Sequence, residues 1–217
     1  MIQLYYYPGT AAMVPHILLE EIGVPYDRVL VDRAAGAHQR PEYLRLNPNG
    51  LLPTLAEGDL VLYETAAIAL YLCDTHPQAQ LAPPLGSAAR ANFYKWLMWL
   101  GNTLQTTLIV YFYPERWVNE GNAGAAAEVK AHAEQKAAGL LDQLDAELAR
   151  HGEPWFAGNE YTALDAYVFT LCRWTRNFRN QAPARSRLHL GPYLERMLAR
   201  PALLRALGNE RHAAPFV

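Results

Sequence analysis

The hydrophobic pattern of residues 1–79 switches between the period of a strand and the period of a helix. Residues 2–7 form a short apolar and aromatic run that ends at Pro8 and Gly9, which predicts a strand followed by a turn. Further elements are expected as a helix over 11–23, a strand over 26–32, a short helix over 41–46, strands over 51–56 and 60–63, and a helix over 64–76. The predicted order is therefore β-α-β-α-β-β-α, an α/β domain.

The pattern becomes helical throughout after a segment rich in proline. Pro83, Pro84 and Gly86 mark residues 80–87 as a linker. Beyond the linker, helices are expected over 88–117 with a break before Pro114, over 123–150, over 162–178, over 193–200 and over 201–207. The sequence thus predicts an α/β domain over residues 1–79 and an all-α helical domain over residues 88–217.

Composition and charge argue against several classes of protein. The chain of 217 residues is 51% hydrophobic and 18% charged, which is typical of a folded globular protein. A formal net charge of −2 argues against a nucleic-acid partner. Cys73 and Cys172 belong to no CxxC pair and the histidines lie at no ligand spacing, so we expect neither a disulfide scaffold nor a metal site.

The two cues that would direct the chain to a membrane are missing from the pattern. The N-terminus carries no basic segment followed by a long apolar run, and no apolar stretch approaches the roughly 18 residues of a spanning helix. We therefore expect a cytoplasmic protein with no signal peptide and no membrane partner.

Four segments along the chain carry a common resemblance. They are YYYPGT at 5–10, NPNGLLPTL at 47–55, YETAAIALYL at 63–72 and TALD at 162–165. Together they resemble the cytosolic glutathione transferase family over the whole chain, with features of its bacterial beta-like or nu/theta-like members. The resemblance implies a thioredoxin-like N-terminal domain that binds glutathione as co-substrate, a helical domain that supplies the second-substrate pocket, and a homodimer.

Glu64 and Thr65 open a helix directly after a predicted strand. The first turn of a helix presents unpaired N–H groups and the positive end of the helix dipole, so it favours an anion. The resemblance implies that the γ-glutamyl carboxylate of glutathione lies there, held by the hydroxyl and amide of Thr65, while Glu64 meets the amino group of the ligand. The alternative is that Thr65 only caps its own helix.

Two further contacts with glutathione are implied by the resemblance. Proline at the start of a strand donates no ladder hydrogen bond, and the family has this Leu52–Pro53 bond in the cis form. The backbone of Leu52 would then pair with the tripeptide as an added strand. His38 and Gln39 would meet the glycine carboxylate, more weakly than a His-Lys pair, because Gln39 is uncharged. The alternatives are a trans turn proline and a solvated loop histidine.

The group that activates the thiol of glutathione is sought in the loop after the first strand. Lowering a thiol pKa of about 8.5 by two units requires about 2.7 kcal/mol. One hydrogen bond to a charged acceptor supplies about 1.5–3 kcal/mol, and a helix N-terminus adds about 0.3–1 kcal/mol. Thr10 is the first choice for this catalytic hydroxyl and Tyr6 the second. The alternative is that Thr10 is only a helix cap and Tyr6 packs a core.

Three positions depart from the beta class of the family. That class has a cysteine at the position of Ala11, so a mixed disulfide with the protein is excluded there. Met98 and Gln105 stand where it carries an asparagine and a histidine. The polar contacts of the helical domain with the ligand are therefore in question.

Aromatic side chains of the helical domain are candidates for the second-substrate pocket. Large flat apolar surfaces with polar tips suit an apolar electrophile. From this cluster we choose as exposed lining Tyr111, Tyr113 and Trp174. The alternative is that they pack the core of the helical domain.

The resemblance favours an enzyme of detoxification, a transferase that conjugates glutathione thiolate to a hydrophobic electrophile. Two alternatives stay open. One is a glutathione-dependent disulfide reductase or peroxidase, in which a second glutathione resolves the intermediate. The other is a non-catalytic binding protein of the same family, which the loss of the beta-class cysteine makes credible.

Overall fold

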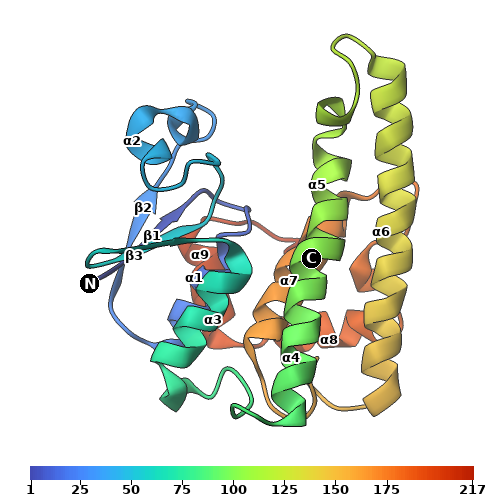
Figure 1. Ribbon diagram of the computed structural model, residues 1–217. Coiled ribbons are helices and arrows are strands. Elements are labelled where there is room, and N and C mark those ends of the chain that lie inside the picture. Colours follow the sequence, from blue (N-terminus) through green and yellow to red (C-terminus); the bar gives the residue numbers. More distant parts are fainter. The chain divides into compact units, whose positions relative to one another are not determined.

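The computed structural model describes all 217 residues, and the chain forms two compact units. The first comprises Met1–Pro83 together with Leu198–Ala213, and the second comprises Pro84–Met197 together with Ala214–Val217. Each unit therefore contains a segment from the C-terminal end of the chain. Figure 1 shows the elements of both units.

A mixed four-stranded sheet in the order β2-β1-β3-β4 forms the centre of the first unit. Strand β1 (Ile2–Tyr6) runs parallel to β2 (Tyr26–Leu30) and antiparallel to β3 (Thr54–Glu57), which pairs with β4 (Leu60–Tyr63) in a hairpin. Leu4 lies opposite Leu55, and both are fully buried. The alternation of β1 therefore puts its even-numbered side chains, including Tyr6, on one face of the sheet.

The helices of this part of the chain follow the order that the sequence predicts, and the domain is thioredoxin-like. They are α1 (Met13–Ile22), the short α2 (Pro41–Leu44) and α3 (Thr65–Thr75). Gly23 ends α1 in the left-handed conformation, as a glycine after a helix commonly does. Helix α1 lies against β1 and α3, and its apolar residues from Met13 to Leu19 are buried.

Helix α9 (Pro201–Asn209) also belongs to the first unit, where the sequence interpretation assigned it to the helical domain. Its buried face consists of Ala202, Leu203, Ala206 and Leu207, and it packs on α1 (Figure 1). Two ion pairs, Arg200 with Glu21 and Arg205 with Glu20, flank this contact. An amphipathic pattern predicts that a helix has a buried face, but it does not state which neighbour covers that face.

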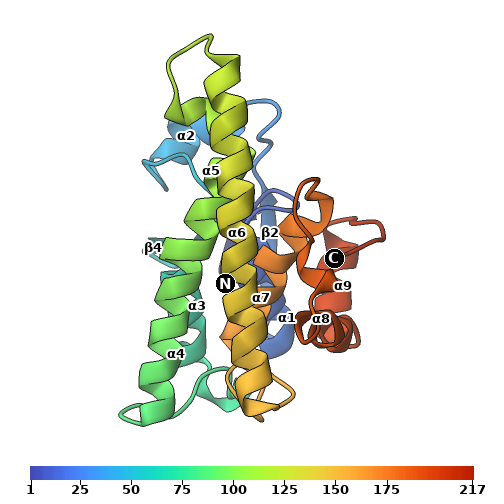
Figure 2. The ribbon, with the colours of Figure 1, turned by 90° about the vertical axis from the view of Figure 1, so that its right-hand side faces the viewer.

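The second unit is helical, as predicted. It contains α4 (Ala88–Trp99), a π-helical turn (Leu100–Gln105), α5 (Thr106–Phe112), α6 (Ala123–His151), α7 (Ala163–Trp174) and α8 (Leu190–Leu198). Helices α5 and α6 lie side by side, and α7 packs against α4 (Figures 1 and 2). The helical run from residue 88 ends at Phe112, before Pro114, where the sequence places its break.

Helix α7 is the buried centre of the second unit. All of its residues are buried, which the continuous apolar pattern predicts. Its N-terminus has the capping box expected at 162–165: the side chains of Thr162 and Asp165 each bond the backbone of the other. Asp165 also accepts hydrogen bonds from the amide of Phe156 and the hydroxyl of Tyr193.

Two observations concern the whole chain. Cys73 and Cys172 are both buried, and neither forms a disulfide bond. None of the helices combines the length and the apolar character that crossing a membrane requires.

Candidate functional site

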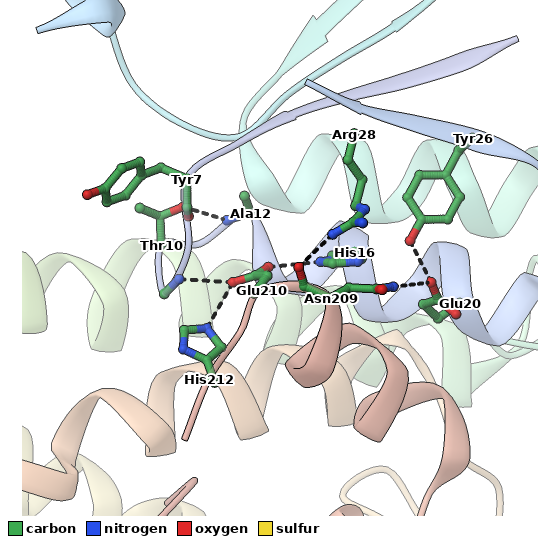
Figure 3. A network of polar contacts seen from close by, with 11 residues as sticks. Tyr7, Thr10, Ala12, His16, Glu20, Tyr26, Arg28, Asn209, Glu210 and His212 are labelled. Carbon is green, nitrogen blue, oxygen red and sulfur yellow. Dashed lines mark hydrogen bonds and ion pairs between the residues drawn. The ribbon is translucent and has the colours of Figure 1, made fainter. Parts of the chain in front are cut away.

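The loop between β1 and α1 carries Thr10, the first choice for the thiolate-stabilising hydroxyl. Its Oγ1 donates to the carbonyl oxygen of Tyr7 at 2.8 Å and accepts from the amide of Ala12 at 3.4 Å (Figure 3). The N-cap of α1 is Ala12, which makes no side-chain cap, so Thr10 stands ahead of the cap position. Thr10 is half-buried, and its hydroxyl lies next to a helix start whose side-chain cap is missing.

Tyr6, the second choice, points elsewhere. Its ring lies 6.1 Å from the ring of His16 on α1, centroid to centroid, and the guanidinium of Arg28 sits 5.7 Å above it. These contacts hold the phenol on the face of the sheet that α1 covers. The contacts of Tyr6 are therefore with α1 and β2, whereas those of the Thr10 hydroxyl are with the backbone of its own loop.

Glu64 and Thr65 occupy the junction between β4 and α3. Glu64 is exposed and has φ 73° and ψ 114°, a conformation that non-glycine residues rarely adopt. It is the N-cap of α3, yet its side chain makes no cap hydrogen bond. Thr65 is the first residue of the helix and is buried, so it does not occupy the cap position that the alternative required. The first turn of α3 is left without a side-chain cap, which suits an anionic ligand.

The Leu52–Pro53 peptide bond is cis, as the resemblance implied. Pro53 is buried and Leu52 half-buried. Tyr43 and Asn47, which the sequence analysis did not single out, fix the turn before this bond: the hydroxyl of Tyr43 and the amide of Asn47 both donate to the carbonyl oxygen of Leu51, at 2.6 and 2.8 Å.

His38 and Gln39 lie beside the same turn, in the 3-10 helix η1 (Ala37–Gln39). The amide group of Gln39 donates to the carbonyl oxygen of Gly50 at 3.5 Å. Gly50 has φ 61°, and a Cβ there would come within 3.0 Å of the carbonyl oxygen of His38. Glycine is thus required for η1 to approach the turn, and the structure brings His38 and Gln39 close to the segment that holds Leu52 and Pro53.

The helical unit corrects part of the predicted pocket lining. Tyr111 and Trp174 were expected to be exposed, but they are only 7% and 8% exposed. Tyr111 packs its ring against Phe112 and Phe178, and burial raises the pKa of its hydroxyl. Phe112, one position along the helix, is 42% exposed, because successive helical residues point about 100° apart.

Three further positions of the helical unit that the sequence singled out differ in their exposure and contacts. Tyr113 is half-buried, and the guanidinium of Arg116 lies 4.1 Å above its ring. Met98 is exposed. Gln105 accepts a hydrogen bond from the hydroxyl of Tyr167. Of the three predicted lining residues, Tyr113 alone keeps substantial exposure.

A buried carboxylate, Glu210, joins the site and was missed by the sequence analysis. Its Oε2 accepts from the amide of Gly9 and contacts Nε2 of His212, both at 2.9 Å, and its Oε1 lies 2.9 Å from Nδ1 of His16 (Figure 3). Burial by itself raises the pKa of Glu210, but the hydrogen bonds from His16, His212 and Gly9 outweigh it and lower the pKa to about 2. No sequence motif marks this residue, since two of its three partners, Gly9 and His16, lie about two hundred positions away.

Comparisons with known proteins agree over nearly the full chain. The protein-family model of the glutathione S-transferase N-terminal domain matches residues 1–74, and the family model of the C-terminal domain matches residues 102–201. Glutathione S-transferase GST-4.5 of Xanthomonas campestris pv. campestris is 31% identical over 96% of this chain and 98% of that relative.

Solved structures are similar as well. A glutathione S-transferase from Xylella fastidiosa has a TM-score of 0.87 and 29% identity, covering 98% of this chain and 100% of that one. A glutathione transferase homologue from Sulfitobacter, solved with bound glutathione, has a TM-score of 0.86 and 26% identity, covering 96% and 98%.

Proposed function

Because the chain belongs to the glutathione transferase family, we propose that it conjugates the thiolate of glutathione to a hydrophobic electrophile. The observation that carries this proposal is the position of Thr10. Its hydroxyl lies at the start of α1, in the same unit as Glu64, Thr65 and the Leu52–Pro53 bond. The reaction would serve detoxification in the cytoplasm.

Glutathione would be held by groups spread along one end of the first unit. The first turn of α3 receives the γ-glutamyl carboxylate, and the carboxylate of Glu64 meets the amino group. The backbone of Leu52 pairs with the cysteinyl residue of the tripeptide. His38 and Gln39 face the glycine carboxylate. This arrangement directs the sulfur toward the loop that carries Thr10.

The proposed reaction requires the protein to stabilise the thiolate of glutathione by one hydrogen bond. The thiol loses its proton to solvent, and the thiolate accepts a hydrogen bond from the hydroxyl of Thr10, which turns its hydrogen away from the carbonyl of Tyr7. That bond stabilises the anion by about 1.5–3 kcal/mol, which lowers a thiol pKa of about 8.5 by about one to two units and so brings it close to neutral pH. The thiolate then attacks the electrophilic carbon, a carbon–sulfur bond forms, and a leaving group such as chloride departs with its electron pair.

The second substrate would be apolar. We assign it to aromatic side chains of the helical unit, with Tyr113 and the exposed Phe112 as the surfaces it meets.

We also propose that the protein works as a homodimer. Size-exclusion chromatography tests this, since a single chain has a mass of 24.3 kDa and the dimer twice that.

Substitution of Thr10 tests the function. Thr10→Ala should lower conjugation of chlorodinitrobenzene at least about tenfold, because one hydrogen bond to the thiolate is lost, and Thr10→Ser should restore most of it. Thr75→Ala is a matched control, because Thr75 is an exposed threonine of the same unit whose hydroxyl also bonds a backbone carbonyl.

The same assay separates the alternatives. An unchanged rate in Thr10→Ala contradicts the assignment of the hydroxyl. Turnover of a small disulfide that exceeds turnover of aryl halides identifies a glutathione-dependent reductase. Binding of glutathione without turnover across a panel of electrophiles identifies a non-catalytic member of the family.

A further inference from the structure

The segment after α9 reaches back to the loop that follows the first strand of the chain. Glu210 and His212 leave the end of α9, and the carboxylate of Glu210 accepts the amide hydrogen of Gly9, the residue before Thr10 (Figure 3). The two ends of this contact are separated by 201 positions in the sequence. A residue with no place in the proposed glutathione contacts thus touches the backbone that presents the thiolate-stabilising hydroxyl.

The carboxylate is held from three directions. Glu210 is only 4% exposed, and its two oxygens meet the amide of Gly9, the ring of His16 on α1 and the ring of His212. Hydrogen bonds to an ionised group are short and about twice as strong as those between neutral groups. A carboxylate fixed in this way keeps the amide nitrogen of Gly9 in one place.

The position of Gly9 determines the position of Thr10. Gly9 has φ 75°, a conformation that glycine leaves easily, and the backbone of the turn is closed across it by a long hydrogen bond of 3.3 Å from the amide of Thr10 to the carbonyl oxygen of Tyr7. The ring of His212 closes over it, since a Cβ on Gly9 would lie 3.5 Å from Cε1 of that ring. The hydroxyl of Thr10 is one peptide unit further along. A hydrogen-bond donor acts on a developing or resting anion only when it is placed to within about 0.5 Å.

We propose that Glu210 is a positioning residue of the transferase reaction: through the Gly9 amide it fixes the turn that presents the Thr10 hydroxyl to the sulfur of glutathione. This inference rests on the proposed function, because it takes Thr10 as the group that stabilises the thiolate. Glu210 itself touches neither substrate.

Two variants separate geometry from charge. Glu210→Ala removes the acceptor of the Gly9 amide and leaves the turn with only the hydrogen bonds of Thr10 to the carbonyl oxygen of Tyr7. Glu210→Gln keeps the shape of the side chain. Its amide oxygen still accepts a hydrogen bond from the amide of Gly9, and its NH₂ group donates one to Nδ1 of His16. The proton of the His16 ring is then carried by Nε2, which has no hydrogen-bond partner in the wild-type structure. Glutamine should therefore preserve the turn although the charge is gone.

A matched control exists on the same two helices. Glu21 of α1 accepts a bidentate hydrogen bond from Arg200, just before α9, at 2.6 and 2.8 Å. Glu21→Gln weakens the attachment of the C-terminal segment to α1 without touching the Gly9 amide. It reports what loss of stability alone does to the reaction.

The experiment titrates glutathione bound to each protein by the ultraviolet absorbance of its thiolate and measures hydrogen exchange of the peptide segment that contains Gly9. In Glu210→Ala we expect the pKa of bound thiol to rise by about one unit, kcat with chlorodinitrobenzene at neutral pH to fall about tenfold, and exchange at Gly9 to accelerate. Glu210→Gln and Glu21→Gln should keep the thiol pKa and the exchange rate close to those of the wild type.

The outcomes are distinguishable. If wild-type protein binds glutathione without forming thiolate, the proposed function fails and the positioning role fails with it. If the wild type forms thiolate and Glu210→Ala keeps the same thiol pKa and the same exchange at Gly9, the positioning role alone is overturned. An equal loss in Glu21→Gln also overturns it, because general loosening of the C-terminal segment then accounts for the effect.

Discussion

Glu210 and His16 form a carboxylate–imidazole pair that is completely closed to solvent. Oε1 of Glu210 lies 2.9 Å from Nδ1 of His16, and neither side chain exposes any of its surface. His16 is on α1 and Glu210 follows α9, so the pair fastens the C-terminal segment to the first helix. A buried ionised group is tolerated only when it is paired and hydrogen-bonded, and here three groups do this for one carboxylate.

The stability of the fold should therefore depend on pH through Glu210. Its folded-state pKa of about 2 lies below the ordinary 4.5, so the stabilisation is complete above about pH 4.5 and is lost as the pH falls toward 2. The difference corresponds to on the order of 3 kcal/mol. Urea unfolding measured between these limits should show the free energy of unfolding falling steeply in the wild type and less steeply in Glu210→Gln. Parallel curves for the two proteins would show that the pair does not govern acid stability.

Tyr6→Phe should leave the conjugation rate within about twofold of the wild type. The phenol ring is held against His16 and beneath Arg28, on the α1 face of the sheet, and removal of its hydroxyl keeps both ring contacts. Steady-state kinetics with chlorodinitrobenzene, compared with Thr10→Ala, measures the effect. A tenfold loss in Tyr6→Phe would mean that the hydroxyl of Tyr6 shares the stabilisation of the thiolate.

Local periodicity explains why so much of the fold was predictable. The order β-α-β-α-β-β-α and the buried α7 follow from short-range patterns of apolar residues, and the sheet and helices confirm them. The capping box at Thr162 and Asp165 is also local, because its two side chains are three positions apart. The cis bond before Pro53 came from the resemblance to a family and not from base rates, which favour trans.

Relationships over long sequence distances could not be predicted. Nothing near Glu210 indicates a contact with Gly9 or His16, and the apolar face of α9 fits a helical domain as well as it fits α1. The error on Tyr111 has a different cause. Its neighbours Phe112 and Tyr113 are also aromatic, so no polar residue in this run sets which side of α5 faces the core.

Substitution of Glu64 by glycine should stabilise the fold and weaken the binding of glutathione. Its backbone has φ 73° and ψ 114°, and such a conformation costs a non-glycine residue about 1–3 kcal/mol. Glu64→Gly relieves that strain at an entropic cost of about 0.5–1 kcal/mol, so the free energy of unfolding should rise by about 1 kcal/mol. The KM for glutathione should rise at the same time, about tenfold, because the partner of its amino group is lost.

Glu64→Gln separates the two effects. It keeps the strained backbone and removes only the charge, so it should raise the KM for glutathione without raising the midpoint of urea unfolding. If Glu64→Gly proves less stable than Glu64→Gln, the backbone at this position is not strained. If both variants keep the wild-type KM, the carboxylate of Glu64 does not meet the ligand.

Gln39→Lys should strengthen the binding of glutathione. Gln39 is exposed in η1, next to the turn of Gly50, where the glycine carboxylate of the tripeptide is proposed to lie. A lysine ammonium in its place would form an exposed ion pair with that carboxylate, worth about 0.5 kcal/mol, so the KM for glutathione should fall about twofold while kcat stays unchanged. The gain should disappear in high salt, because solvent-exposed charges are screened.

Gln78→Lys supplies the matched control for this prediction. Gln78 is also exposed and also lies in a short 3-10 helix, η2 (Pro77–Ala79), so the substitution adds the same charge to the same unit away from η1. If it lowers the KM as much as Gln39→Lys, the gain comes from the net charge of the protein and not from a local contact. A gain confined to Gln39→Lys would place the glycine end of glutathione beside η1. Together with the Glu64 variants, which report on the opposite end of the ligand, it would fix the direction in which the tripeptide lies.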